Sequence, residues 1–199
     1  MRKQWCLLMV LLGVFVAETG YPFDKTFIHG YYGQVADMSM RNMFSEPDRI
    51  TDFQDGHMIT LGYGVENMYW EDRFSFGGEV NGTYHWGYKH QELGEFSAAL
   101  FVRWYKFPWA WKIPQSITIG DGLSYVTDYP QYELDFGGNE SGQLKEKWLN
   151  FFFIEIAFGM TEKMDLFVRL HHRCTAWGLI GSPNEAGSTF PSLGLRYTF

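Results

Sequence analysis

The chain has 199 residues, which suits a single domain of ordinary size. Its formal net charge of −7 offers no basic surface for nucleic acid, so we expect no nucleic-acid partner. Aromatic residues make up 19% of the chain and glycine is frequent, a composition typical of β-strands joined by tight turns and flanked by aromatic interfacial residues.

Residues 1–20 have the pattern of a secretory signal peptide, with a basic start followed by an apolar run. That run, which begins at Cys6, is too short for a comfortable membrane-spanning helix. We expect cleavage near residues 17–20, which leaves a single domain over residues 21–199 with Cys174 as its cysteine. A retained N-terminal anchor is the alternative. No later apolar run is long enough for a spanning helix, so strands are the remaining way to cross a membrane.

Downstream of this segment the sequence predicts eight β-strands, in which successive side chains point to opposite faces. They cover residues 27–35, 58–70, 73–86, 95–106, 113–126, 147–158, 165–176 and 193–199. The third strand alternates most clearly, with Phe74, Phe76, Val80 and Tyr84 on one face. The eighth strand is apolar at every second position and ends on Phe199, as the last strands of outer-membrane barrels do.

Short and long connections alternate along the chain. Short turns are predicted at 71–72, 107–112 and 160–163, and longer loops at 36–56, 86–94, 127–146 and 177–187. Period alone also fits a secreted sandwich that buries its aromatic faces. The even strand number, the strand lengths and the loop asymmetry favour an all-β, eight-stranded antiparallel transmembrane up-and-down β-barrel. Its location would be the outer membrane of a Gram-negative cell.

The alternation assigns balanced charges to the barrel lumen. The predicted lumen residues are Glu66, Glu79, Arg103, Arg169, Arg173 and Arg196. Glu155 joins them if the sixth strand points its odd residues inward. Because eight strands enclose no wide pore, we expect ion pairs to fill the lumen, which disfavours a small pore as the function.

His172 and Cys174 share the apolar face of the seventh strand with Leu166, Val168 and Leu170. That strand runs outward in this topology, so both residues would face lipid near the outer leaflet. An imidazole facing hydrocarbon has an energetic cost, which suggests a functional role. The alternative is that both lie at headgroup level without a chemical role. The neighbouring residue His171 faces the lumen and is expected to be structural.

Three runs near the C-terminus resemble the lipid A 3-O-deacylase (PagL-like) family of outer-membrane barrels. They are Arg-Leu-His-His-Arg-Cys-Thr at 169–175, Gly-Ser-Pro-Asn-Glu-Ala-Gly-Ser at 181–188 and Gly-Leu-Arg-Tyr-Thr-Phe at 194–199. Residues 122–125 are similar to a segment of more distant members. The first half of the chain resembles the family only in its strand pattern.

The resemblance implies hydrolysis of an ester-linked acyl chain of lipid A, with lipopolysaccharide and outer-membrane lipid as partners and no metal or diffusible cofactor. By position, His172 matches the general base and Cys174 the nucleophile, where the family has Ser. Thr175 replaces an Asn that helps to bind the oxyanion. The Glu that orients the base has two candidate positions here, Glu185 and Ser188. The rival hypothesis is a non-catalytic barrel that serves envelope integrity or surface binding through its loops.

Overall fold

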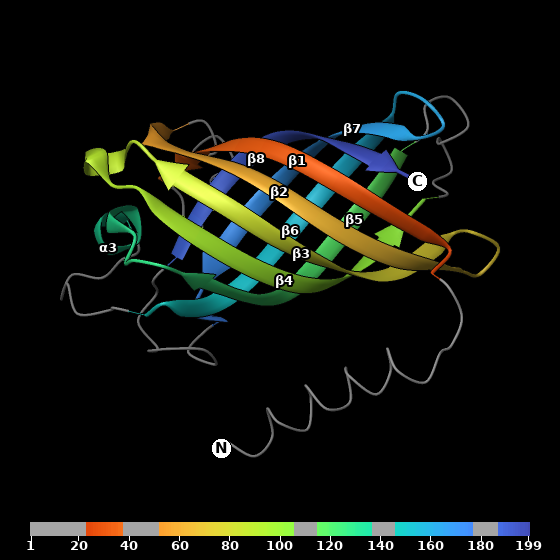
Figure 1. The fold of residues 1–199 in the computed structure, drawn as a ribbon, viewed down its shortest axis with the longest axis horizontal. Coiled ribbons are helices and arrows are strands. Elements are labelled where there is room, and N and C mark those ends of the chain that lie inside the picture. The colour runs from red at the N-terminus through yellow and green to blue at the C-terminus, as the bar shows by residue number, and fades with distance from the viewer. Residues whose placement is uncertain (1–22, 38–51, 106–114, 137–145, 177–186) are drawn as a thin grey trace, which may run out of the picture.

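The computed structural model describes residues 23–37, 52–105, 115–136, 146–176 and 187–199 (Figure 1). The predicted signal peptide lies outside these residues. Eight strands are present: β1 (Lys25–Ala36), β2 (Phe53–Tyr69), β3 (Phe74–Trp86), β4 (Leu93–Trp104), β5 (Gln115–Val126), β6 (Trp148–Gly159), β7 (Met164–Cys174) and β8 (Gly187–Thr198). Each pairs with the next, and β1 also pairs with β8 in antiparallel register. The sheet therefore closes, and the predicted fold class is confirmed.

The barrel wall has an apolar outer face and a polar inner face. Exposed apolar side chains occupy the outer face of all its strands, among them Ile28, Leu61, Phe76, Val80, Phe96, Leu100, Ile119, Ile156, Val168, Leu193 and Leu195. A sandwich in water would bury such residues, whereas a barrel in lipid exposes them. This wall, together with the closed sheet, is that of an outer-membrane barrel.

Ion pairs fill the lumen, as the alternation predicts. Arg169 lies 2.6 Å from Glu79 and 2.7 Å from Glu155, all fully buried. Arg196 also contacts Glu155, and Arg103 lies 2.8 Å from Glu66. The odd residues of β6 thus point inward. Two acids join this network without having been predicted there: Glu95 at the start of β4, and Glu133 from a loop.

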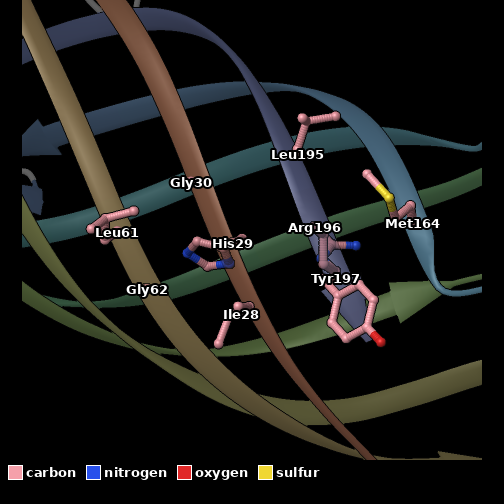
Figure 2. Close-up of a pocket in the computed structure, with 9 residues that line it drawn as sticks. All are labelled: Ile28, His29, Gly30, Leu61, Gly62, Met164, Leu195, Arg196 and Tyr197. Atoms are coloured by element: carbon pink, nitrogen blue, oxygen red, sulfur yellow. The ribbon is translucent and has the colours of Figure 1, made fainter. Parts of the chain in front are cut away.

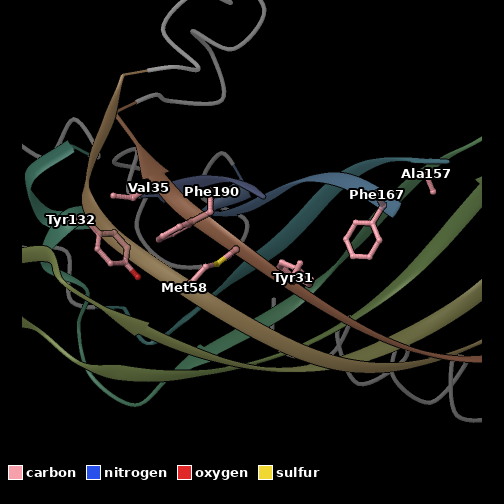
Figure 3. Packing of buried hydrophobic residues seen from close by; sticks show 7 residues of the cluster. All are labelled: Tyr31, Val35, Met58, Tyr132, Ala157, Phe167 and Phe190. Atoms are coloured by element: carbon pink, nitrogen blue, oxygen red, sulfur yellow. The ribbon is translucent and has the colours of Figure 1, made fainter. Parts of the chain in front are cut away.

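An apolar cluster also lies within the barrel (Figure 3). Its members are Tyr31, Val35, Met58, Tyr132, Ala157, Phe167 and Phe190. Tyr132 comes from a short helix, α3 (Gln131–Phe136), and packs edge-on against Phe190 of β8. The cluster therefore ties the loop between β5 and β6 to the interior of the barrel.

The two ends of the barrel differ. The short turn at residues 70–73 and the turn at 160–163 lie at the end where the C-terminus is marked, whereas α3 and the one-turn helix η2 (Tyr88–His90) lie at the opposite end (Figure 1). Outer-membrane barrels have short periplasmic turns and longer outer loops, so the α3 end is the outer end. No helix in the described part of the chain is long and apolar enough to cross a membrane.

Several predicted boundaries are corrected. β2 begins at Phe53 instead of residue 58, and β8 begins at Gly187 instead of residue 193. β7 ends at Cys174 because the backbone turns at Ala176, where φ is +46°. The early starts arise from pairing between strands: Phe53 pairs with Ala36, and Gly187 pairs with Cys174. Pairing of this kind extends a strand beyond the residues in which apolar and polar side chains alternate.

Candidate functional site

The candidate site lies on the outer face of β5, β6, β7 and β8, in the outer half of these strands. Inward Arg169, His171 and Arg173 alternate with outward Leu170, His172 and Cys174 along β7. The predicted face of His172 and Cys174 is thus the observed one. Unlike Val168, which is exposed, His172 is only 2% exposed. Its imidazole is therefore packed into the wall and does not extend freely into lipid.

The imidazole of His172 is held from β8. Its Nδ1 lies 2.8 Å from Oγ1 of Thr189, which is its direct cross-strand partner. Its Nε2 is buried and has no hydrogen-bond partner among the described residues. An Nδ1–H that donates to the Thr189 hydroxyl leaves a lone pair on Nε2, which is the state that a general base requires.

The thiol of Cys174 is held from β6. Its Sγ lies 3.7 Å from Oδ1 of Asn150, its direct cross-strand partner. The amide of Asn150 in turn donates to Oδ1 of Asp121, at 2.9 Å, and to the carbonyl of Gly122, at 3.0 Å. Because these two acceptors use both N–H groups, the amide oxygen must face the thiol. No hydrogen bond joins the described side chains of His172 and Cys174.

We call these five side chains the outer-face polar cluster: Asp121, Asn150, His172, Cys174 and Thr189. They come from four adjacent strands, β5 to β8, and two cross-strand rows connect them. One row runs Asp121, Phe152, His172, Thr189, and the other runs Leu123, Asn150, Cys174, Gly187. The cluster thus combines the candidate base, the candidate nucleophile and a carboxylate on a surface that is otherwise apolar.

The two candidates for the orienting residue do not contact the imidazole through described side chains. Ser188 points into the lumen and donates to Oε1 of Glu133, at 2.9 Å. Glu185 lies outside the described residues. Thr175, at the position of the family's Asn, is buried just beyond the end of β7. Oγ1 of Thr189 lies at Nδ1 of His172, and the backbone of Ser188 also hydrogen-bonds this imidazole.

The inward residues on either side of His172 anchor β7 from within the barrel. Arg173 lies 2.5 Å from Glu133 of α3 and donates from Nε to the hydroxyl of Ser124, at 2.9 Å. His171 lies 2.9 Å from the hydroxyl of Tyr31. These contacts fix the backbone that carries His172 and Cys174, and they agree with the structural role expected for His171.

Sequence reasoning missed Asp121, Asn150 and Thr189. A signal for the first two is present in the alternation, because each is a polar residue in the outward register with apolar outward residues on both sides of it along the strand. Thr189 carried no such signal, since it fell before the predicted start of the last strand.

A separate pocket lies in the wall towards the other end of the barrel (Figure 2). Its lining includes outward Ile28, Leu61 and Leu195, with Met164 and Tyr197 beside them. Leu195 pairs with Leu166, which is six residues before His172 on β7, or about 20 Å along the strand. The pocket is therefore not part of the outer-face polar cluster.

No family model matches the chain, and no curated protein matches it. Among solved structures, the barrel is similar to the crystal structure of the outer membrane enzyme PagL, with a TM-score of 0.59 and 15% identity over 86% of this chain and 98% of that one. It is also similar to Neisserial surface protein A (NspA), with a TM-score of 0.50 and 14% identity over 87% and 97% of the two chains. At these identities the similarity establishes the fold alone: an eight-stranded barrel of the outer-membrane type.

Proposed function

We propose that the protein is an ester hydrolase that removes an acyl chain from lipopolysaccharide at the outer leaflet. The observation that carries this proposal is the state of His172, whose Nδ1 is held by Thr189 while its buried Nε2 has no described partner. Cys174 follows two residues later on the same face. A base with a free nitrogen beside a thiol is the minimum that acyl transfer through a nucleophile requires.

The reaction would proceed in two balanced steps. The sulfur of Cys174 attacks the ester carbonyl carbon while the thiol proton passes to Nε2 of His172, and the proton then leaves with the alcohol as the ester C–O bond breaks. Water, activated by the same nitrogen, hydrolyses the thioester, which releases the fatty acid and restores the thiol. Rotation of the Cys174 side chain away from Asn150 must come first, because its hydrogen bond now points there.

The hydrogen bond between Cys174 and Asn150 favours the rival hypothesis, a non-catalytic barrel. The described thiol bonds Asn150 instead of His172, and no carboxylate among the described residues contacts the imidazole. A thiol and an imidazole on one surface would then be structural. The two hypotheses differ in whether lipid A loses an acyl chain when the protein is present.

Mass spectrometry of lipid A from cells that express the protein tests this proposal. The wild type should remove one ester-linked acyl chain, Cys174→Ala should remove none, and Cys174→Ser should retain part of the activity because a hydroxyl can replace the thiol. Val168→Ala, an outward change on the same strand, is the matched control and should act as the wild type. Unchanged deacylation by Cys174→Ala would refute the nucleophile. An inactive wild type would favour the non-catalytic barrel.

A further inference from the structure

Asp121 is a carboxylate in the wrong environment for a structural role. It is exposed on the outer face of β5, where its neighbours are apolar with the exception of Asn150. Leu100 and Phe152 are its cross-strand partners, and Ile119 and Leu123 flank it along the strand. Ionisable side chains that face hydrocarbon are costly, so one that is present calls for a ligand or partner.

The barrel satisfies this carboxylate only in part. Within the described residues, Asn150 is the side chain that donates a hydrogen bond to it, at 2.9 Å. A carboxylate can accept about four hydrogen bonds, so capacity remains on the side that faces the membrane. In a bilayer, the molecules that reach this side are lipids.

Asp121 is also connected to the two residues of the proposed chemistry. Asn150, which donates to Asp121, accepts from the thiol of Cys174. Asp121 lies in the same cross-strand row as His172, two strands away, or about 10 Å between backbones. Independently, the buried Nε2 of His172 has no hydrogen-bond partner among the described residues, so it is able to accept a hydrogen bond from a bound molecule.

We propose that Asp121 is the lipid-recognition residue of this site. Its carboxylate accepts a hydrogen bond from an uncharged O–H or N–H group that the bound lipid carries within about 10 Å of the ester. Negative phosphate is repelled. Asp121 is five residues before the end of β5 at Val126, about 16 Å along the strand and about 12 Å in depth at the usual strand tilt, so acyl-region groups are expected beside it instead of charged headgroups. The donor is therefore a hydroxyl on the acyl chain or an amide linkage.

The recognition rests on the proposed function only in naming the ester, so a binding experiment tests it separately. The full-length barrel in detergent micelles is treated with a maleimide, and alkylation of Cys174 is followed by peptide mass spectrometry as probe lipid is added. Three probes that cannot be hydrolysed share chain length and a zwitterionic headgroup. One has a plain ether-linked chain, one has a hydroxyl near the ether linkage, and one is amide-linked.

In the wild type, a donor-bearing probe should protect Cys174 at about tenfold lower concentration than the plain probe, which is the effect of one hydrogen bond to a charged group. Asp121→Leu should remove this preference, and Ile119→Ala, the apolar neighbour, should keep it. Preference for the hydroxylated probe alone, or for the amide probe alone, identifies the donor.

Equal protection by all probes, no protection by any, or a preference that persists in Asp121→Leu would overturn the recognition role. None of these measurements requires an ester to be cleaved. Failure of the deacylase proposal would instead appear as unaltered lipid A in cells, so failure of the recognition role and failure of the deacylase proposal are distinguishable.

Discussion

At the scale of the residue, the site depends on how Thr189 holds the imidazole of His172. A hydroxyl can fix the ring orientation and the tautomer by accepting from Nδ1–H, as a carboxylate does in a catalytic triad. A hydroxyl carries no full negative charge, so it cannot stabilise the imidazolium that forms during the reaction as a carboxylate does. The proposed acyl transfer should therefore be slower here than in a site in which a carboxylate occupies that position.

Replacing Thr189 by Val removes the hydroxyl while keeping the shape of the side chain. We expect the initial deacylation rate to fall about tenfold or more, because an imidazole that has lost this hydrogen bond samples wrong orientations and tautomers. Thr189→Ser should keep most of the rate. The measurement is release of fatty acid from purified lipopolysaccharide, with the fold checked by heat-modifiable migration on gels. Equal rates for the Val and Ser variants would exclude this role.

Much of the site's orientation could be predicted from alternation, because the two-residue period of a strand places His172 and Cys174 outward and Arg173 inward. The hydrogen bonds could not be predicted. Asn150 contacts Cys174 only because β6 and β7 have a particular register, and register between strands that are joined by a turn is not written in either strand alone. The contact between His172 and Thr189 depends in the same way on the register between β7 and β8.

At the scale of the element, the inner face of β5 is packed against β4 through Gly122. A Cβ at this position would collide with the backbone carbonyl of Ala98 and with Cα of Ala99. Backbone atoms cannot move aside without separating the two strands. At Gly82 of β3, by contrast, a Cβ would meet open space.

Gly122→Ala should therefore destabilise the barrel by about 1–3 kcal/mol or more, as overpacking does, and Gly82→Ala should be nearly neutral. The midpoint of urea unfolding in lipid vesicles, followed by tryptophan fluorescence, measures both. Similar midpoints for the two variants would mean that β4 and β5 adjust more freely than their register indicates.

The helix α3 was not predicted, because residues 127–146 are rich in turn-forming residues and α3 is a single short helix held by tertiary contacts. Its Glu133 lies 2.5 Å from Arg173 inside the outer mouth of the barrel. Burial raises the pKa of the Glu133 carboxyl above its ordinary value of 4.5, although Arg173 acts in the opposite direction. The Glu133 carboxyl therefore binds a proton more tightly when α3 is docked in the barrel than when α3 is undocked.

Docking of α3 should consequently weaken as the pH rises from about 4.5 through the raised pKa of Glu133. Amide hydrogen exchange in α3, corrected for intrinsic rates, should show less protection at pH 7 than at pH 4.5. Glu133→Gln should remove this dependence. Asp135→Asn should keep it, because Lys89 lowers the pKa of Asp135 below 3.8, outside the window. Protection that increases with pH would contradict the assignment.

At the scale of the whole molecule, the barrel is inverted relative to a soluble protein, with charges inside and apolar side chains outside. This could be predicted, because strand alternation and the balance of charges both follow from the sequence, and closure leaves no unpaired edge in lipid. The pairing of individual charges could not be predicted, since Glu79 of β3 meets Arg169 of β7 across the lumen.

The pair of Glu79 and Arg169 tests whether the lumen is a desolvated core. The guanidinium donates to both carboxylate oxygens, at 2.6 and 3.0 Å, and neither side chain is exposed. Arg169→Met leaves the buried Glu79 poorly compensated and should cost about 3–5 kcal/mol of unfolding free energy. Glu79→Met should cost somewhat less, because Glu155 still pairs with Arg169. The double variant should cost clearly less than the sum, because both charges leave together.

The matched control is the surface pair of Arg73 and Glu71, which are 3.6 Å apart with side chains 57% and 80% exposed. Glu71→Met should cost less than about 1 kcal/mol, since water screens such a pair. Urea unfolding in vesicles gives all four values on one scale. If the lumen variants cost no more than the surface variant, water must reach Glu79 and Arg169, and the interior would be a hydrated channel instead of a core closed by ion pairs.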